Sequence, residues 1–186
     1  MRPRLAVVLF NLGGPDRPES IRPFLLNLFN DAAILRVPFP VRPMLARRIA
    51  NARLKPARKS YAILGGRSPL LELTQRQAAL LQAELAEVEA KCFIAMRYWH
   101  PLSDETARAV RDWGPDEVVL LPLYPQYSST TTGSSLTAWR EAAARAGLVA
   151  RTSVVCCYPT DGAYIAATAG VLREAWSRAS AELGPA

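Results

Sequence analysis

Four short apolar runs are spaced along the chain and separated by longer segments of mixed polarity. They are Leu5–Phe10, Cys92–Met96, Val118–Leu121 and Ser153–Cys157. Their hydrophobicity is nearly continuous and does not alternate, which is typical of parallel strands covered on both faces. Each run therefore predicts a buried strand.

The segments between and after these runs have the apolar spacing and end signals of helices. We predict helices over Ile21–Phe29, from a capping box of Thr74 and Gln77 to about Ala90, from a capping Ser103 to just before Gly114, over Leu136–Ala146 and over about Tyr164–Glu182. Strands that alternate with helices form βαβ units. The predicted fold class is therefore α/β, with an open, parallel four-stranded sheet and helices on both faces.

The 186 residues of the chain are enough for one domain with a sizeable core. Three cysteines, two of them adjacent, are too few for a disulfide framework, so we expect a cytoplasmic location and buried structural thiols at Cys92, Cys156 and Cys157. The N-terminal run Leu5–Phe10 is too short for a signal peptide. The longest stretch without a charged residue, Val118–Trp139, is broken by prolines and hydroxyl residues and does not predict a membrane span.

The net charge of +7 comes from one segment. Between Arg36 and Ser60 there are eight basic residues and no acidic one, while the rest of the chain holds 15 basic and 16 acidic residues. A single cationic patch suits an anionic ligand, an anionic lipid surface or nucleic acid. A solvated helix face is the simpler alternative, because charged residues usually face water.

The residues that follow the apolar runs are the candidates for a binding site, because open parallel sheets bind ligands outside the carboxyl ends of their strands. The first run is followed by the turn Asn11–Pro15, whose glycines would let a bulky ligand approach the backbone. The later runs are followed by Arg97, Tyr98, Trp99, Tyr124, Tyr127 and Tyr158. Aromatic faces beside a cation indicate a large, flat, partly anionic ligand. The alternative is that these aromatic residues cap the core.

The hydroxyl-rich stretch Ser128–Ser135 is suited either to an anion site or to capping the helix that follows it. It lacks the lysine of a P-loop and the glycine spacing of a dinucleotide fingerprint. We therefore expect no nucleotide there.

Four motifs, in this order along the chain, resemble the ferrochelatase family, whose members insert ferrous iron into protoporphyrin. They are NLGGP at Asn11–Pro15, GGRSPL at Gly65–Leu70 after Tyr61, MRYWHPL at Met96–Leu102 and LPLYPQYSSTTTGSS at Leu121–Ser135. The last motif is long and specific, and the resemblance covers essentially the whole chain. It implies a chelatase-like, Rossmann-like domain, with the porphyrin held in a cleft between this domain and a second one.

The resemblance also implies which residues contact the porphyrin. Asn11 and Leu12 match a turn against the macrocycle, and Leu25 and Leu28 fall on a helix at the mouth of the pocket. Arg53, Tyr61 and Ser68 match residues at the propionate end of the ring. Arg97 and Tyr98 match a pair near the proposed metal-entry side, and Tyr124 matches a pocket tyrosine.

The family's catalytic histidine lies in a Ser-x-His motif beyond the helix that ends this sequence, and its acidic partner lies further on. We therefore expect residues 1–186 to be the N-terminal domain alone, without a catalytic residue or a metal ligand. We do not expect His100, the only histidine, to be the catalytic base. We also expect no organic cofactor and no iron–sulfur cluster of the animal type, since Ser129 stands where such enzymes have a cysteine.

The expected function is thus that of the N-terminal half of a haem-biosynthesis lyase that inserts Fe²⁺ into protoporphyrin IX, inactive alone. A porphyrin- or haem-binding module without catalysis, a coproporphyrin ferrochelatase fragment and a phosphate- or nucleic-acid-binding domain are the alternatives. The expected partners are porphyrin, the second domain and an anionic membrane surface, bound peripherally through Arg36–Lys59. We do not expect nucleic acid.

Overall fold

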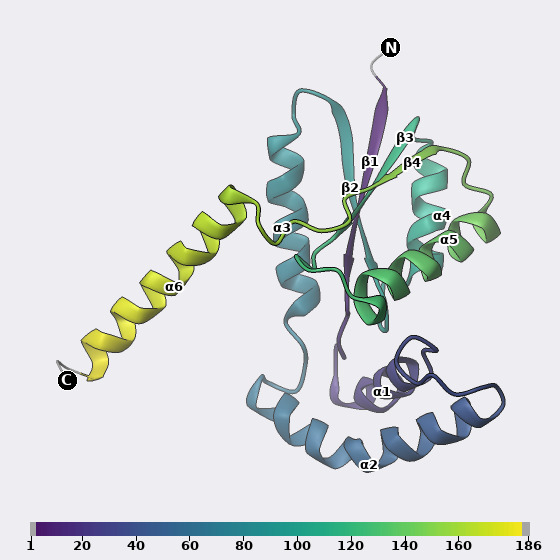
Figure 1. Cartoon of the computed structure of the whole chain (residues 1–186), viewed down its shortest axis with the longest axis vertical. Helices are drawn as coiled ribbons and strands as arrows, with labels where there is room; N and C mark the ends of the chain where they lie inside the picture. The colour runs from purple at the N-terminus through teal and green to yellow at the C-terminus, as the bar shows by residue number, and fades with distance from the viewer. Residues whose placement is uncertain (1–2, 184–186) are drawn as a thin grey trace.

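The structure, a computed structural model, describes residues 3–183 and is built around one parallel sheet (Figure 1). The strands are β1 (Arg4–Asn11), β2 (Glu89–Met96), β3 (Glu117–Pro122) and β4 (Arg151–Val154), in the spatial order β2-β1-β3-β4. The helices are α1 (Ile21–Phe29), α2 (Val41–Ile63), α3 (Leu70–Glu84), α4 (Ser103–Trp113), α5 (Ser134–Ala146) and α6 (Gly162–Leu183), with a 3₁₀ turn η1 (Pro18–Ser20) and a π-helical turn η2 (Ser129–Gly133). The predicted α/β class and the four-stranded parallel sheet are confirmed.

Helices cover both faces of the sheet because the side chains of each strand alternate in direction. On β1, Val8 and Phe10 point toward α4 and α5, where they pack with Trp139. Val7 and Leu9 point the other way and pack against α3. The continuous apolar pattern of β1 therefore reflects burial on two sides, as expected for a central parallel strand.

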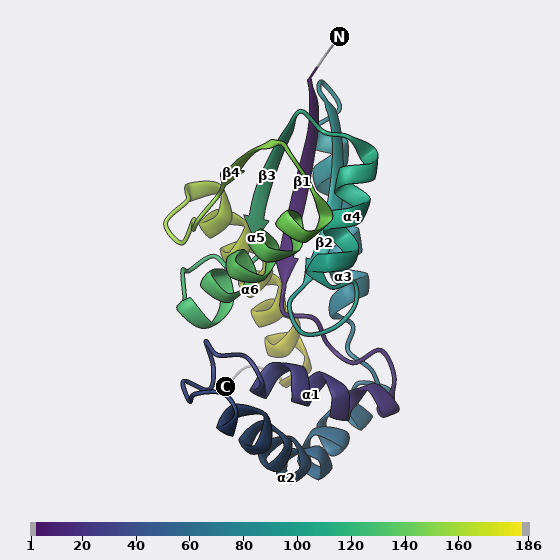
Figure 2. The same cartoon turned by 90° about the vertical axis from the view of Figure 1, so that its right-hand side faces the viewer.

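Helices α1 and α2 form a separate layer beyond the carboxyl ends of the strands (Figure 1, Figure 2). Their shared core includes Ile21, Phe24 and Ala50. Tyr98, which follows β2, packs into the same core and joins this layer to the sheet. The layer therefore lies at the edge where the sequence predicts a binding site.

Helix α2 is absent from the predicted helices. Only Ala46 and Ala50 are buried along its 23 residues, so no wide apolar stripe marks it in the sequence. It also contains Pro56, a residue that usually ends or kinks a helix. Packing against α1 stabilises α2, and that contact is not visible in a local pattern.

Two predicted helix caps are wrong. Thr74 lies inside α3, fully buried, and its hydroxyl donates a hydrogen bond to the carbonyl oxygen of Leu70 at 2.8 Å. Ser103 is the first residue of α4, and the N-cap position before it is occupied by Leu102, which has no capping side chain. The predicted extension of α3 to Ala90 is also wrong, because Ala90 already pairs with Leu5 in the sheet.

The fourth strand is shifted and exposed relative to the prediction. It spans Arg151–Val154 instead of Ser153–Cys157, and all four of its residues are exposed. Within residues 3–183 it is an edge strand, paired with β3 alone. For this reason Cys156 and Cys157, predicted to be buried, are exposed thiols. Cys92, on β2 at the opposite edge of the sheet, is half-buried.

Helix α6 leaves β4 and extends away from the rest of the molecule (Figure 1). Its bounds agree with the predicted helix, but its apolar side chains lie in solvent, with Trp176 75% exposed. None of the helices in the described part of the chain is long and apolar enough to cross a membrane.

Candidate functional site

The turn after β1 and the turn after β2 are joined by backbone hydrogen bonds. The Arg97 amide donates to the Asn11 carbonyl at 2.9 Å, and the Tyr98 amide donates to the Leu12 carbonyl at 3.0 Å. Gly13, with a φ of 81°, makes this junction possible. A Cβ at Gly13 would lie 3.0 Å from the Trp99 nitrogen, so a larger residue would be both strained and crowded.

Asn11 fixes this turn to α3. Its side-chain nitrogen donates to the Thr74 hydroxyl at 3.0 Å, and its side-chain oxygen accepts from the Leu12 amide at 2.8 Å. Both polar atoms of the Asn11 amide are therefore used inside the protein. Asn11 positions the backbone that carries Leu12, and its own side chain has little left to offer a ligand.

Asp31 is the centre of a buried polar cluster that the sequence analysis missed. Its carboxylate accepts hydrogen bonds from the Tyr98 hydroxyl at 2.7 Å and from the Ser134 hydroxyl, and it forms an ion pair with Arg97 at 2.9 Å. Burial alone would raise the pKa of Asp31, but the hydrogen bonds from Ser134 and Tyr98 outweigh burial and lower it. No motif marks Asp31, because its partners lie 67 and 103 residues away.

This Asp31 cluster joins three segments of the chain: the residues just after α1, the turn after β2 and the start of α5. Arg97 also donates to the Ser134 hydroxyl at 2.6 Å and lies over the Tyr98 ring, 4.8 Å from its centre. A cavity of about 460 Å³ opens beside the cluster, lined by Arg97 and Arg42 among others. The arginine predicted for the site is thus held in place by a carboxylate.

Tyr98 is fully buried and does not form part of an open surface. Burial, followed by the hydrogen bond to Asp31, raises the pKa of its hydroxyl well above the ordinary value. It therefore stays protonated and serves as a donor within the protein. Tyr98 thus belongs to the core, as in the alternative reading of the aromatic residues that follow the strands.

The other aromatic residues at this edge also face inward in part. The Tyr158 hydroxyl donates to the Pro122 carbonyl at 3.0 Å, and the Trp99 indole donates to Asp16 at 3.0 Å. Burial raises the pKa of Tyr124 to about 12. Tyr127, by contrast, is 57% exposed. Fewer of these aromatic side chains are therefore available to a ligand than the sequence suggests.

Two of the three residues expected at the propionate end, Ser68 and Tyr61, lie near the second glycine of the turn. A Cβ at Gly14 would lie 2.5 Å from the Ser68 hydroxyl and 4.0 Å from the Tyr61 hydroxyl. The Ser68 amide donates to the Pro15 carbonyl at 2.7 Å, which holds this loop against the turn. Both hydroxyl groups thus lie within 4.0 Å of the position that a side chain at Gly14 would occupy.

The remaining expected contacts are distributed over the same edge. Leu12, Leu25 and Leu28 belong to the cluster around Tyr98, in which Leu25 is 7% exposed and the other two are half-buried. Arg53 is exposed on α2, about two turns before Tyr61. The structure therefore places Leu12, Tyr61, Ser68 and Arg53 where a ligand could meet them, and Leu25 mostly inside the protein.

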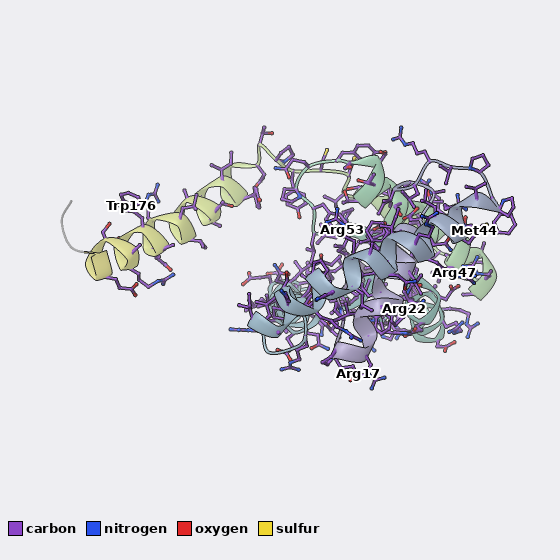
Figure 3. All side chains as sticks on the ribbon, turned by 90° about the horizontal axis from the view of Figure 1, so that it is seen from below. Arg17, Arg22, Met44, Arg47, Arg53 and Trp176 are labelled. Atoms are coloured by element: carbon purple, nitrogen blue, oxygen red, sulfur yellow. The ribbon has the colours of Figure 1, made fainter. Side chains whose placement is uncertain are left out.

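The segment Arg36–Ser60 becomes an exposed cationic face on α2. Figure 3 shows Arg47 and Arg53 on this face, with Arg22 of α1 beside them. The exposed basic side chains of α2 are Arg47, Arg48, Arg53, Lys55, Arg58 and Lys59. None of these forms an ion pair with another described residue within 4.0 Å.

His100 lies apart from the Asp31 cluster. It is exposed, with its Nδ1 atom 2.6 Å from a carboxylate oxygen of Glu105 and its ring edge-on to Trp99. Within residues 3–183, no group of three or more His, Cys, Asp or Glu side chains is arranged to hold a metal ion.

Comparison with known proteins agrees with the motifs. Residues 4–184 match the ferrochelatase family model. The chain is 57% identical over 183 residues to the ferrochelatase of Caulobacter vibrioides (strain NA1000 / CB15N), an alignment that covers 96% of this chain and 52% of the relative. It is 55% identical over 180 residues to the ferrochelatase of Phenylobacterium zucineum, covering 95% and 52%. The ferrochelatase of Hyphomonas neptunium is 52% identical over 182 residues, covering 95% and 50%. The chain spans about half the length of these relatives.

Proposed function

Because this chain belongs to the ferrochelatase family, we propose that it supplies the N-terminal, ring-binding half of an enzyme that inserts Fe²⁺ into protoporphyrin IX in haem biosynthesis. The observation that carries the proposal is the joined pair of turns after β1 and β2, with the Tyr61 and Ser68 hydroxyls beside Gly14. This arrangement offers an apolar wall next to hydrogen-bond donors. A flat ring with carboxylate side chains requires both.

In this proposal, the residues at the carboxyl edge of the sheet hold the ring in different ways. Leu12 presents an apolar side chain to the macrocycle, from a backbone fixed by Asn11. The Tyr61 and Ser68 hydroxyls donate to a propionate, and the exposed guanidinium of Arg53 attracts the same negative charge. Arg97 is held by Asp31 and keeps a cation beside the ring-binding edge.

Holding the ring contributes to catalysis by bending it out of plane. A bent porphyrin turns its nitrogen lone pairs toward the incoming metal, so binding energy is used on the way to the transition state. In this proposal the base that accepts the pyrrole protons lies outside the described residues, and His100 remains a surface residue paired with Glu105.

The test is an absorbance titration of the 186-residue chain with protoporphyrin IX, followed by anaerobic Fe²⁺ in the same cuvette. We expect saturable band shifts and no metal insertion above the protein-free rate. Arg53→Ala and Ser68→Ala should each weaken the binding, whereas Arg108→Ala, an exposed arginine on α4, should leave it unchanged. Coproporphyrin, titrated in parallel, reports whether additional carboxylates are preferred.

Two results would contradict the proposal. If no saturable shift occurs with either porphyrin, this half does not bind the ring by itself. If Fe²⁺ insertion exceeds the protein-free control, the base lies within this chain, and His100 becomes the first residue to substitute.

We also propose that the cationic face of α2 contacts an anionic membrane surface peripherally. Its unpaired basic side chains lie next to apolar residues that are unusually exposed, with Phe39 at 75% and Met44 at 67%. Each basic residue near an anionic bilayer contributes about 1 kcal/mol of attraction, and salt screens this attraction. Apolar side chains beside the charges would add insertion into the interface.

Co-sedimentation with vesicles tests this contact. Binding to phosphatidylserine-containing vesicles should exceed binding to pure phosphatidylcholine and fall with added salt. Glu substitutions at Arg47 and Arg48 should weaken it more than the same substitutions at Arg108 and Arg140 on α4 and α5. Equal binding to both vesicle types, or a preference for duplex DNA over anionic vesicles, would contradict the membrane proposal.

A further inference from the structure

The cavity of about 460 Å³ beside the Asp31 cluster is not used by the proposed ring-binding function. It lies where the layer of α1 and α2 faces α4 and α5 (Figure 2). Among the described residues expected to contact the porphyrin, Arg97 alone lines it. Its wall also includes Asn30 just after α1, Arg42 at the start of α2 and Ser103 at the start of α4. This volume is sufficient for a small molecule.

Most of the charged side chains that line this cavity already have partners within the protein. Arg97 pairs with Asp31 at 2.9 Å. Arg145 pairs with Asp104 at 2.9 Å and with Glu141 at 3.8 Å. These contacts involve every carboxylate among the described lining residues. The charges of both arginines are therefore compensated by the protein itself.

Arg42 is the lining arginine without such compensation. It is half-buried, and no described residue forms an ion pair with it within 4.0 Å. Its Nε atom is buried and has no hydrogen-bond partner. Charges that are removed from water are ordinarily paired, because their desolvation costs free energy. Arg42 thus places an uncompensated cation in the wall of the cavity.

We propose that this cavity binds a small oxyanion of the phosphate type, with Arg42 as the principal ligand. A guanidinium can donate two parallel hydrogen bonds to such an anion. The side-chain amide of Asn30 and the hydroxyl of the buried Ser103 line the same cavity. The start of α4 lines it too, has no side-chain cap and favours negative charge. Donors from three elements suit a tetrahedral anion better than a planar carboxylate.

The phosphate group can come from two sources that share this chemistry. A soluble phosphate or phosphate ester would enter the cavity from solution. A phosphate monoester headgroup would enter from a lipid surface, and this second source rests on the proposed membrane contact. Apolar side chains near Arg42 in the sequence are exposed, with Phe39 at 75%, Val41 at 52% and Met44 at 67%.

The test of the soluble source follows the broadening of the phosphorus NMR signals of inorganic phosphate and glycerol phosphate by the chain, at constant ionic strength set with chloride. We expect saturable binding, weakened about tenfold or more in Arg42→Gln because charge-assisted hydrogen bonds are lost. Asn30→Asp, which adds a negative charge to the same wall, should also weaken it. Arg47→Gln is the matched control, since Arg47 is exposed on the same helix and does not line the cavity.

The test of the lipid source compares vesicles that contain phosphatidic acid with phosphatidylserine vesicles matched for surface charge. Binding through this cavity gives a preference for phosphatidic acid, whose phosphate monoester is accessible. Arg42→Gln should abolish that preference. Arg47→Gln should lower binding to both vesicle types and keep the preference. Far-UV circular dichroism should show every variant folded, because Asn30 and Arg47 are exposed and Arg42 has no ion pair to lose.

An effect of Arg42→Gln on the soluble phosphates or on the phosphatidic acid preference supports the inference and identifies the source. Three results would overturn it: no effect of Arg42→Gln on either probe, an equal effect of Arg47→Gln, or displacement of phosphate by one equivalent of protoporphyrin IX. Displacement would make the cavity part of the ring-binding site. The phosphate measurements need neither porphyrin nor iron, so this inference can fail while the proposed ring-binding function stands.

Discussion

Helices α5 and α6 differ in how they pack, although each follows a strand of the sheet and each carries one tryptophan. Trp139 on α5 is 2% exposed and packs edge-tilted against Phe10 of the central strand. Trp176 on α6 is 75% exposed, and no other described residue forms a ring contact with it. The same residue type in the same kind of element thus takes opposite roles. Burial is a property of the assembled layers and not of the helix alone.

Replacing each tryptophan by alanine tests the comparison directly, and the change at Trp139 has the largest expected effect. Trp139→Ala should lower the free energy of unfolding by about 3–5 kcal/mol, because it leaves a cavity in the core under α5. Trp176→Ala should change the free energy of unfolding by less than about 0.5 kcal/mol, because that side chain already faces water. Urea unfolding followed by circular dichroism measures both. Similar losses in the two variants would show that α6 is packed in solution.

The Asp31 cluster extends the comparison between α5 and α6. It fixes the start of α5 through a buried carboxylate, whereas the start of α6 is held by an exposed cap, in which Asp161 accepts a hydrogen bond from the Tyr164 amide at 2.9 Å. Asp31→Ala should destabilise the chain by about 3 kcal/mol, because it leaves the Arg97 charge and two hydroxyls without their acceptor. Asp112→Ala removes an exposed ion pair with Arg111 and should cost less than about 0.5 kcal/mol. Equal urea midpoints for the two variants would argue against the Asp31 cluster as a structural centre.

Two tyrosines test the same contrast at smaller scale. Tyr98→Phe removes a hydrogen bond to a buried carboxylate and should cost about 1.5–3 kcal/mol. Tyr158→Phe removes a bond to a carbonyl near the exposed end of the sheet and should cost about 0.5–1.5 kcal/mol. Thermal unfolding of the two variants ranks them. A reversed order would place the stronger anchor beside β4.

The smallest expected effect is the pH dependence of stability that Asp31 contributes. The pKa of Asp31 is lower in the folded protein than in the unfolded chain, so its contribution is present at neutral pH. That contribution is lost as the pH falls from the unfolded-state value of about 3.9 through the lower folded-state value. Urea midpoints measured down this range should fall more steeply for the original chain than for Asp31→Asn. Parallel curves would mean that Asp31 does not carry the acid dependence.

Local pattern was sufficient for the strands and helices that are buried on a regular period. Leu5–Phe10 and Ile21–Phe29 are apolar in the correct spacing, and both elements lie within one residue of their predicted ends. It was insufficient for α2, whose stability comes from α1, and for β4, whose apolar residues lie at an exposed edge. Thr74 was misread because its hydroxyl has the chemistry of a cap but serves Asn11 across the fold.

The sequence by itself determined the fold class, the family and the edge of the sheet where the motifs gather, because each of these depends on short runs of neighbouring residues. Only the tertiary structure decided which side chains at that edge face outward. Tyr98 and Arg97 are adjacent in the sequence, yet the Tyr98 hydroxyl turns inward to Asp31 while the side chain of Arg97 stays 24% exposed. The reason is physical: a buried carboxylate requires donors from several elements at once, and those donors meet only when the layers have packed.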